Sequence, residues 1–184
     1  QVLLYNKDKL SAEDVTSYET ITSKAKFGAS LNEVNAYAIA PLMLSVGNNI
    51  FGPNGEDVKG TNWANEKGVA VMKWLAAQKQ NSGFVNVPDN EAVSKFGNGT
   101  VDAIETGPWN YPDAVKALGK DKIGVAVYPT VQIDGQTVQQ KAFMGVKLYA
   151  VNQAPAQGDT KRIAAAYKLA SYLTQKDRQA NQFK

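Results

Sequence analysis

Apolar residues in this chain form short runs and helical stripes in alternation, a pattern typical of an α/β fold. Each short apolar run predicts a strand, and these lie at residues 1–5, 26–30, 101–105, 123–127 and 143–151. The last run is the longest strand candidate, and Gly145 within it indicates a bend. Asp134-Gly135 predicts a two-residue hairpin between strands at 131–133 and 136–138.

Helices are predicted where apolar residues recur every three or four positions behind a capping side chain. Asn65 caps a predicted helix at 66–80, in which Val69, Met72 and Ala76 share one face and Trp74 belongs to the core. Asp89, Asp159 and Thr174 are the expected caps of helices at 90–96, at 160–173 and at the chain end. A further helix is expected near 38–45 despite Pro41.

A strand passes into a helix at Thr106-Gly107-Pro108-Trp109-Asn110-Tyr111. Gly107 permits a close backbone approach, Pro108 fixes φ, and Pro112 suits a first helical turn. In open α/β sheets, ligands bind beyond the carboxyl ends of strands, so Trp109 and Tyr111 are candidate ligand contacts. The alternative is that both rings fill local core.

Composition excludes several classes of function. The 184 residues include 20 Lys and Arg against 17 Asp and Glu, and these charges are scattered. No nucleic-acid or membrane partner is therefore indicated, and a neutral ligand such as a sugar fits better. The absence of His and Cys excludes Ser-His-Asp and Cys-His catalysis and the usual zinc sites. We therefore expect no metal and no cofactor.

The ends of the chain suggest a mature or excised segment. Residue 1 is Gln rather than Met, and residues 1–5 lack the basic start of a signal peptide. No apolar run approaches the roughly 18 residues that span a bilayer.

Six short motifs, in order along nearly the whole chain, resemble the maltose/maltodextrin-binding proteins of ABC importers. They are Tyr5-Asn6-Lys7-Asp8, Asn35-Ala36-Tyr37 before Ala40-Pro41-Leu42, Phe96-Gly97-Asn98-Gly99, Thr106-Gly107-Pro108-Trp109, Val127-Tyr128-Pro129 and Phe143-Met144-Gly145-Val146. The resemblance implies an α/β chain that forms one lobe of a two-lobed periplasmic-binding-protein type II fold. Residues 1–145 would be the sugar-binding lobe, and 146–184 a hinge strand and helical segment of the other lobe.

The resemblance also implies a site. Trp109 falls at the position that stacks on a sugar ring, Tyr37 at a second aromatic position, and Tyr111 where family members often carry another. Asn35 falls where a carboxylate can bond sugar hydroxyls, although a small shift of alignment puts Glu33 there. For Tyr37, Tyr111, Asn35 and Glu33, a structural role or a solvated side chain stays open. Asp89 replaces an aromatic contact of the family.

The function implied is that of a receptor for maltose, maltodextrin or a related oligosaccharide. Such a receptor closes on its ligand and delivers it to the permease subunits in the membrane, from an extracellular site, lipid-anchored or periplasmic. The alternatives are a glycoside hydrolase, for which Glu33, Asp89, Glu105 and Asp113 supply carboxylates, and an amino-acid or peptide receptor.

Self-association of the chain is also expected. The stripe of the 160–173 helix needs burial, and the 143–151 strand is well placed for exchange between two copies.

Overall fold

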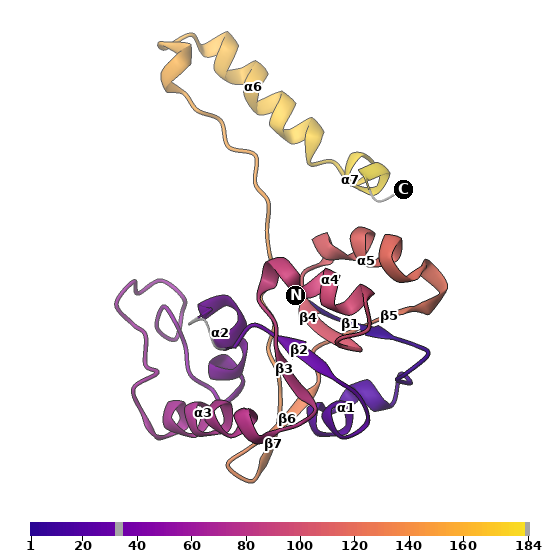
Figure 1. Cartoon of the computed structure of the whole chain (residues 1–184). Helices are drawn as coiled ribbons and strands as arrows, with labels where there is room; N and C mark the ends of the chain where they lie inside the picture. The colour runs from indigo at the N-terminus through magenta and orange to yellow at the C-terminus, as the bar shows by residue number, and fades with distance from the viewer. Residues whose placement is uncertain (32–34, 183–184) are drawn as a thin grey trace. The chain divides into compact units, whose positions relative to one another are not determined.

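The computed structural model of this chain describes residues 1–31 and 35–182, which form two compact units, Gln1–Met144 and Gly145–Lys184 (Figure 1). The first unit combines helices with a mixed β-sheet, so the predicted α/β class is confirmed. Each unit is described separately below.

The first unit is built on a five-stranded sheet of order β3-β2-β4-β1-β5. Strand β1 runs antiparallel to β4 and β5, whereas β2 runs parallel to β3 and β4. The strands are β1 (Val2–Asn6), β2 (Phe27–Ala29), β3 (Phe84–Asn86), β4 (Ala103–Thr106) and β5 (Ile123–Ala126). The 1–5, 26–30, 101–105 and 123–127 predictions are thereby confirmed within a residue or two.

Strand β1 divides the interior into two hydrophobic clusters, because successive side chains of a strand point to opposite faces of the sheet. Leu3 and Tyr5 belong to one cluster and Leu4 to the other, and both leucines are fully buried. Because apolar residues of β1 point to both faces, this strand lies inside the sheet, between β4 and β5.

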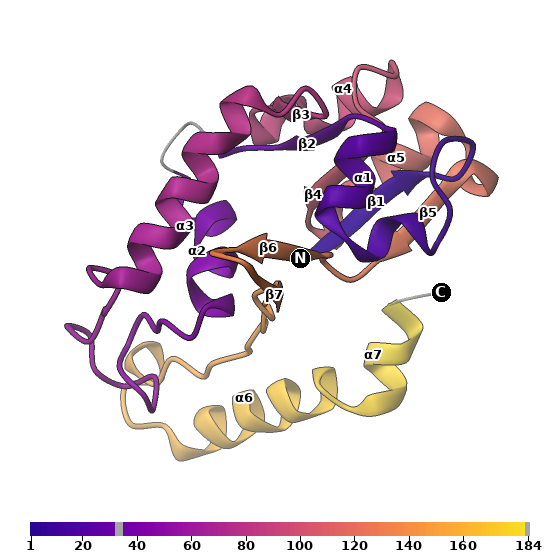
Figure 2. The ribbon, with the colours of Figure 1, turned by 90° about the horizontal axis from the view of Figure 1, so that it is seen from below.

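Helices α1 (Tyr18–Lys24), α2 (Ala36–Ser45) and α3 (Glu66–Ala77) supply side chains to the cluster around Leu3. Helices α4 (Ala92–Gly97) and α5 (Tyr111–Leu118) supply those of the cluster around Leu4. In both ribbon views, α2 and α3 lie on one flank of the unit and α4 and α5 on the other (Figures 1 and 2). Trp74 packs edge-on against Tyr18 with ring centroids 5.0 Å apart, so its predicted core role is confirmed.

The predicted hairpin is confirmed as β6 (Thr130–Ile133) and β7 (Gln136–Gln139). Asp134 has φ 52° and Gly135 φ 75°, which are the left-handed values that a type I′ turn requires at both central residues.

The second unit contains α6 (Thr160–Leu173) and α7 (Lys176–Gln182). Asp159 caps α6 as predicted, since its Oδ1 accepts from the backbone N–H groups of Lys161 and Arg162 at 2.9 and 3.2 Å. Tyr167 and Leu169 on the predicted stripe are exposed, so the self-association inferred from that stripe stays a prediction. Among the described residues, no helix has the length and apolarity needed to cross a bilayer.

The predicted strand at 143–151 is wrong, because this segment has no regular structure. Strand geometry needs a hydrogen-bonding neighbour, and none of the described strands pairs with it. Its alternating apolar side chains instead project into solvent, with Met144 86% and Leu148 84% exposed.

Three smaller predictions are also corrected. Thr174 closes the end of α6, where its Oγ1 donates to Ala170 O at 3.1 Å, and it does not begin α7. Asp89 caps no helix, because its carboxylate instead accepts from Asn35 Nδ2. On α3 the buried face is that of Val71, while Val69 and Met72 are exposed.

We expect Asn65→Ala to lower the free energy of unfolding by about 1–2 kcal/mol. The Asn65 Oδ1 accepts from Gly68 N at 2.9 Å, and its Nδ2 donates to Asn48 Oδ1 at 2.9 Å, so the substitution removes the α3 cap and a tie to the preceding loop. Urea unfolding followed by circular dichroism measures the loss. Lys73→Ala, at an exposed position on the same helix, should change stability by less than half as much; equal losses would contradict the capping role.

Candidate ligand-binding site

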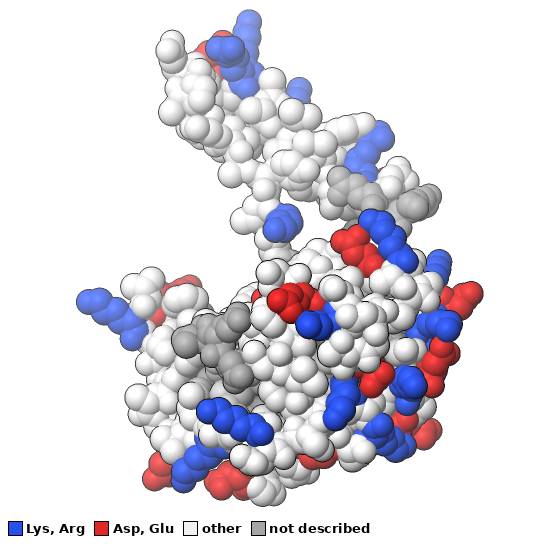
Figure 3. Space-filling view, viewed as in Figure 1, with Lys and Arg blue, Asp and Glu red and all other residues white. Residues whose placement is uncertain are grey.

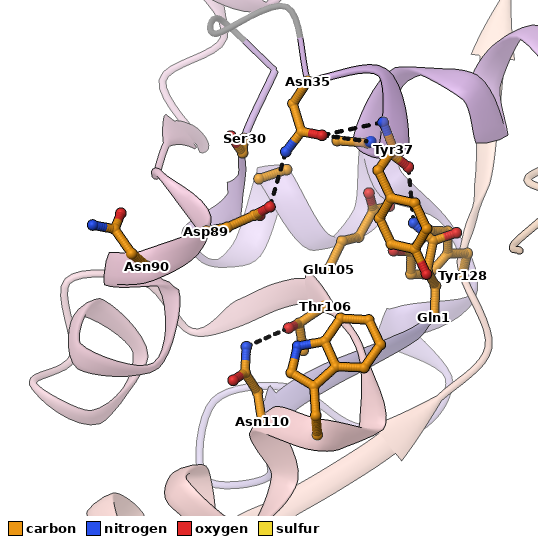
Figure 4. Close-up of a pocket in the computed structure, with 13 residues that line it drawn as sticks. Gln1, Ser30, Asn35, Tyr37, Asp89, Asn90, Glu105, Thr106, Asn110 and Tyr128 are labelled. Carbon is orange, nitrogen blue, oxygen red and sulfur yellow. Dashed lines mark hydrogen bonds between the residues drawn. The ribbon is translucent and has the colours of Figure 1, made fainter. Parts of the chain in front are cut away.

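A pocket of about 260 Å³ opens in the first unit where β2 and β4 end and α2 begins (Figure 4). Its walls come from six separate stretches of the chain. The lining residues are Gln1, Ala29, Ser30, Asn35, Tyr37, Ala38, Asp89, Asn90, Glu105, Thr106, Trp109, Asn110 and Tyr128.

Trp109 forms one rim of the pocket and is 61% exposed. It lies on the 3₁₀ turn η4 (Pro108–Asn110), which follows β4 directly, and Asn110 Nδ2 donates to Thr106 Oγ1 at 2.7 Å across that turn. The indole lies over Gly107: a Cβ built on this glycine would stand 2.1 Å from the Trp109 ring. The Gly-Pro-Trp motif therefore works as a unit, in which the glycine leaves room for the ring.

Tyr37 forms the opposite rim from the first turn of α2. Its ring centroid lies 6.4 Å from that of Trp109 at an interplanar angle of 41°, and it stacks on Phe143 at 5.2 Å and 19°. The side chain of Gln1 holds this stack, because Nε2 donates to Tyr37 O at 2.9 Å and Oε1 accepts from Phe143 N at 2.8 Å. The Gln1 side chain thus ties together the backbones of the two residues whose rings stack, Tyr37 and Phe143.

Asn35 is largely occupied by structural bonds. Its Oδ1 accepts from the N–H groups of Tyr37 and Ala38 at 3.1 and 3.4 Å, which caps α2. Its Nδ2 donates to Asp89 Oδ2 at 2.9 Å. Asn35 keeps one N–H for a ligand, whereas Asp89 Oδ1 has no protein partner among the described residues, so Asp89 is the stronger hydrogen-bonding group here.

Glu105 lies deeper, on β4, as a half-buried carboxyl at the base of the pocket. Gln140 Nε2 donates to its Oε1 at 3.1 Å. Burial raises the pKa of Glu105 to about 7, and the bond from Gln140 offsets part of that rise. Burial, reinforced by the Glu105 charge, also raises the pKa of the neighbouring Tyr128, so that hydroxyl stays protonated.

The structure brings together three of the five residues singled out from the sequence: Trp109, Tyr37 and Asn35. Tyr111 lies outside the pocket and packs against the cluster around Leu4. Glu33 lies outside the described residues. Contact of any of these residues with a ligand stays a prediction.

Sequence reasoning did not assign Asp89, Glu105, Tyr128 and Gln1 to one site. The sequence presents Glu105 as a catalytic carboxylate, Asp89 as a helix cap or a catalytic carboxylate, and Tyr128 as part of a motif. Their common signal is position at one edge of the sheet: Asp89, Glu105 and Tyr128 lie at or after the ends of β3, β4 and β5, and Gln1 precedes β1, which runs antiparallel to β4.

The pocket combines two exposed aromatic faces with a rim of amides, hydroxyls and carboxyls. Such a surface suits a ligand that has both an apolar face and hydroxyl groups. No three Asp or Glu side chains gather closely enough to hold a metal ion in residues 1–31 and 35–182. On the face drawn in Figure 3, basic and acidic side chains are interspersed.

Comparison with known proteins finds similar proteins among bacterial solute-binding proteins. A maltooligosaccharide ABC transporter solute-binding lipoprotein of Streptococcus pneumoniae is 26% identical over 201 residues, covering 97% of this chain and 44% of the relative. The chain thus spans less than half the length of the curated relatives that it matches.

Solved structures agree with the fold. The maltodextrin-binding protein MalE1 from L. casei BL23, solved without ligand, is 38% identical with a TM-score of 0.87, over 97% of this chain and 46% of that one. MalX from Streptococcus pneumoniae, in complex with maltopentaose, is 22% identical with a TM-score of 0.73, over 99% of this chain and 50% of that one, a likeness of fold alone.

The family described as "Bacterial extracellular solute-binding protein" matches residues 1–184. Because this match covers the whole chain, and because the α/β unit carries an aromatic-rimmed pocket at its strand ends, the chain belongs to the bacterial extracellular solute-binding proteins.

Proposed function

We propose that this chain supplies one wall of the ligand site in a solute-binding receptor for maltodextrin or a related oligosaccharide. The observation that carries the proposal is the pair of exposed rings, Trp109 and Tyr37, which line one pocket from two elements together with carboxyl and amide groups. The names of the similar proteins, which refer to maltooligosaccharide and maltodextrin, support the class of ligand.

A pyranose ring has an apolar C–H face and a rim of hydroxyls. Trp109 and Tyr37 would stack on such faces, while Asp89 and the remaining N–H of Asn35 would bond hydroxyl groups. The tilt of 41° between the two rings suits a curved α-linked chain whose successive units turn relative to one another. Tyr111 packs away from this pocket, so we assign it no contact here.

Transport would follow capture. The receptor would enclose the sugar between this wall and a second one, and present the closed form to permease subunits in the membrane. Such a receptor would work outside the cytoplasmic membrane, on a lipid anchor or in a periplasm, and the family description and the name of the lipoprotein relative support this location.

A second candidate, a glycoside hydrolase, draws on one observation. Two carboxyls, Asp89 and Glu105, line the pocket, and a raised pKa is what a general acid needs. Against a hydrolase, each carboxyl already accepts a hydrogen bond from a side-chain amide, Asp89 from Asn35 and Glu105 from Gln140. We therefore favour binding without catalysis.

We expect Trp109→Ala to weaken binding of maltotriose at least about tenfold, because it removes the largest apolar surface on the rim. Titration of the ¹⁵N-labelled chain with maltotriose, followed by backbone chemical shifts, measures affinity into the millimolar range. Phe51→Ala removes an exposed ring from the 48–60 loop, away from the pocket, and should leave the affinity unchanged. Unaltered affinity in Trp109→Ala, with the fold intact, would reject this site.

Gly107→Ala should also weaken maltotriose binding about tenfold, while the free energy of unfolding changes by less than about 1 kcal/mol. The new Cβ occupies the place of the Trp109 ring, and that ring can swing toward solvent because it is exposed. The Trp109 indole N–H signal should shift. Gly145→Ala is the matched control, because no heavy atom lies within 4 Å of its added Cβ.

Incubation of the chain with maltotetraose should yield no shorter sugars after a day at pH 5, 7 or 8. Mass spectrometry of the sugar reads the result directly. Release of maltose or glucose that disappears in both Asp89→Asn and Glu105→Gln would overturn the receptor assignment and establish the hydrolase.

A further inference from the structure

The base of the pocket carries a carboxyl that stacking of a neutral sugar does not require. Glu105 reaches it from β4, and Asp89 lies at the wall from the segment before α4. Tyr128 lines the same pocket of about 260 Å³, so the three groups lie around one small space (Figure 4). Burial raises the pKa of Tyr128, and the charges of Glu105 and Asp89 add to that rise.

No Lys or Arg side chain from the described residues lines the pocket. The terminal ammonium of Gln1, a residue that does line it, is engaged by Phe143 O, to which it donates at 3.3 Å. The partners of Glu105 and Asp89 are neutral amides, Gln140 and Asn35, which bond one oxygen of each.

One polar group at the same place lacks a hydrogen-bond partner within the part of the chain that the structure describes. The Ser30 hydroxyl, on a residue 4% exposed that lines the pocket, is a buried oxygen without a partner. Buried hydroxyls are normally satisfied, so an occupant with hydrogen-bonding groups fits this floor.

We propose that the floor formed by Glu105, Asp89 and Tyr128 is a subsite for a protonated amine carried by the bound oligosaccharide. This inference rests on the proposed sugar site and narrows its ligand to amine-bearing oligosaccharides. An ammonium supplies three donors and the missing positive charge, whereas a hydroxyl supplies one donor and no charge. Trp109 and Tyr37 hold the sugar faces above it.

The sign of the pH dependence follows from the charge on Glu105. A neutral sugar that covers the floor removes water and favours the protonated carboxyl, so its binding weakens as pH rises from 6 to 8 or stays level. An ammonium favours the ionised carboxyl, so its binding strengthens over the same range. The other ionisable groups of residues that line the pocket are the Asp89 carboxyl, the Tyr37 and Tyr128 hydroxyls and the α-amino group of Gln1.

The test compares maltotriose with three derivatives, each with one 6-hydroxyl replaced by a primary amine on a different glucose unit. Such an amine stays protonated to about pH 9, since an alkylamine has an ordinary pKa of about 10. Affinities of the 184-residue chain are measured by NMR titration at pH 6 and pH 8. At pH 8 we expect one derivative to bind at least about tenfold tighter than maltotriose, with the difference reduced at pH 6.

Glu105→Gln should remove most of this preference, measured within the variant as the ratio of its affinity for the derivative to its affinity for maltotriose. Asp113→Asn is the control, because Asp113 lies on α5 outside the pocket and pairs with Lys116 at 2.7 Å. Circular dichroism checks that both variants fold. If Glu105→Gln does not fold, the change in amine preference of the unsubstituted chain between pH 6 and pH 8 is the test of the subsite.

The outcomes separate the two proposals. If maltotriose binds and no derivative exceeds it at pH 8, or the preference survives in folded Glu105→Gln, the amine subsite is wrong and the sugar site stands. If neither maltotriose nor any derivative shifts pocket signals, both proposals fail.

Discussion

The antiparallel insertion of β1 between β4 and β5 is the constraint on which the rest of the first unit depends. Leu3 and Leu4 face opposite clusters, so both layers of helices are held by the same two residues. The register pairs Leu3 with Glu105 on one side and with Ala126 on the other. Because β4 leads to Trp109 and β5 to Tyr128, the burial of β1 fixes the spacing of the pocket walls.

The exposed aromatic rings and the buried polar groups of the pocket lie at different depths. Trp109 and Tyr37 stand at the mouth, where exposed rings lose only loosely bound water when a ligand covers them. Glu105 and Tyr128 lie within, where low dielectric strengthens any bond that a ligand completes and penalises any that it leaves unmade. In the proposed site, Trp109 and Tyr37 would therefore supply most of the affinity, and Glu105 and Tyr128 would select the ligand.

Local patterns predicted strands β1, β2, β4 and β5 of the sheet but not the three-residue β3. They also predicted the caps at Asn65 and Asp159 and the Asp134-Gly135 turn, because each depends on neighbours in sequence. The same patterns failed at 143–151, where alternation was present but a pairing strand was not. Asp89 matched a cap locally, yet its carboxylate bonds Asn35, 54 positions away. Trp109 could be located from its Gly-Pro turn, whereas Glu105 depended on Gln140 and Tyr128, contacts that no local period encodes.

The short segment between β7 and the second unit has a consequence for energy transfer. Gln140 Nε2 bonds Glu105, Lys141 N donates to Ser45 Oγ at 2.9 Å, and the Phe143 ring stacks on Tyr37, so three of the four residues at 140–143 are fastened to the base of the pocket, to α2 and to the rim. Linkage is reciprocal: if a ligand gains free energy by tightening these contacts, the same free energy favours one course of the chain through residues 140–144. This segment would then report occupancy of the pocket, with Phe143 as its contact to the rim.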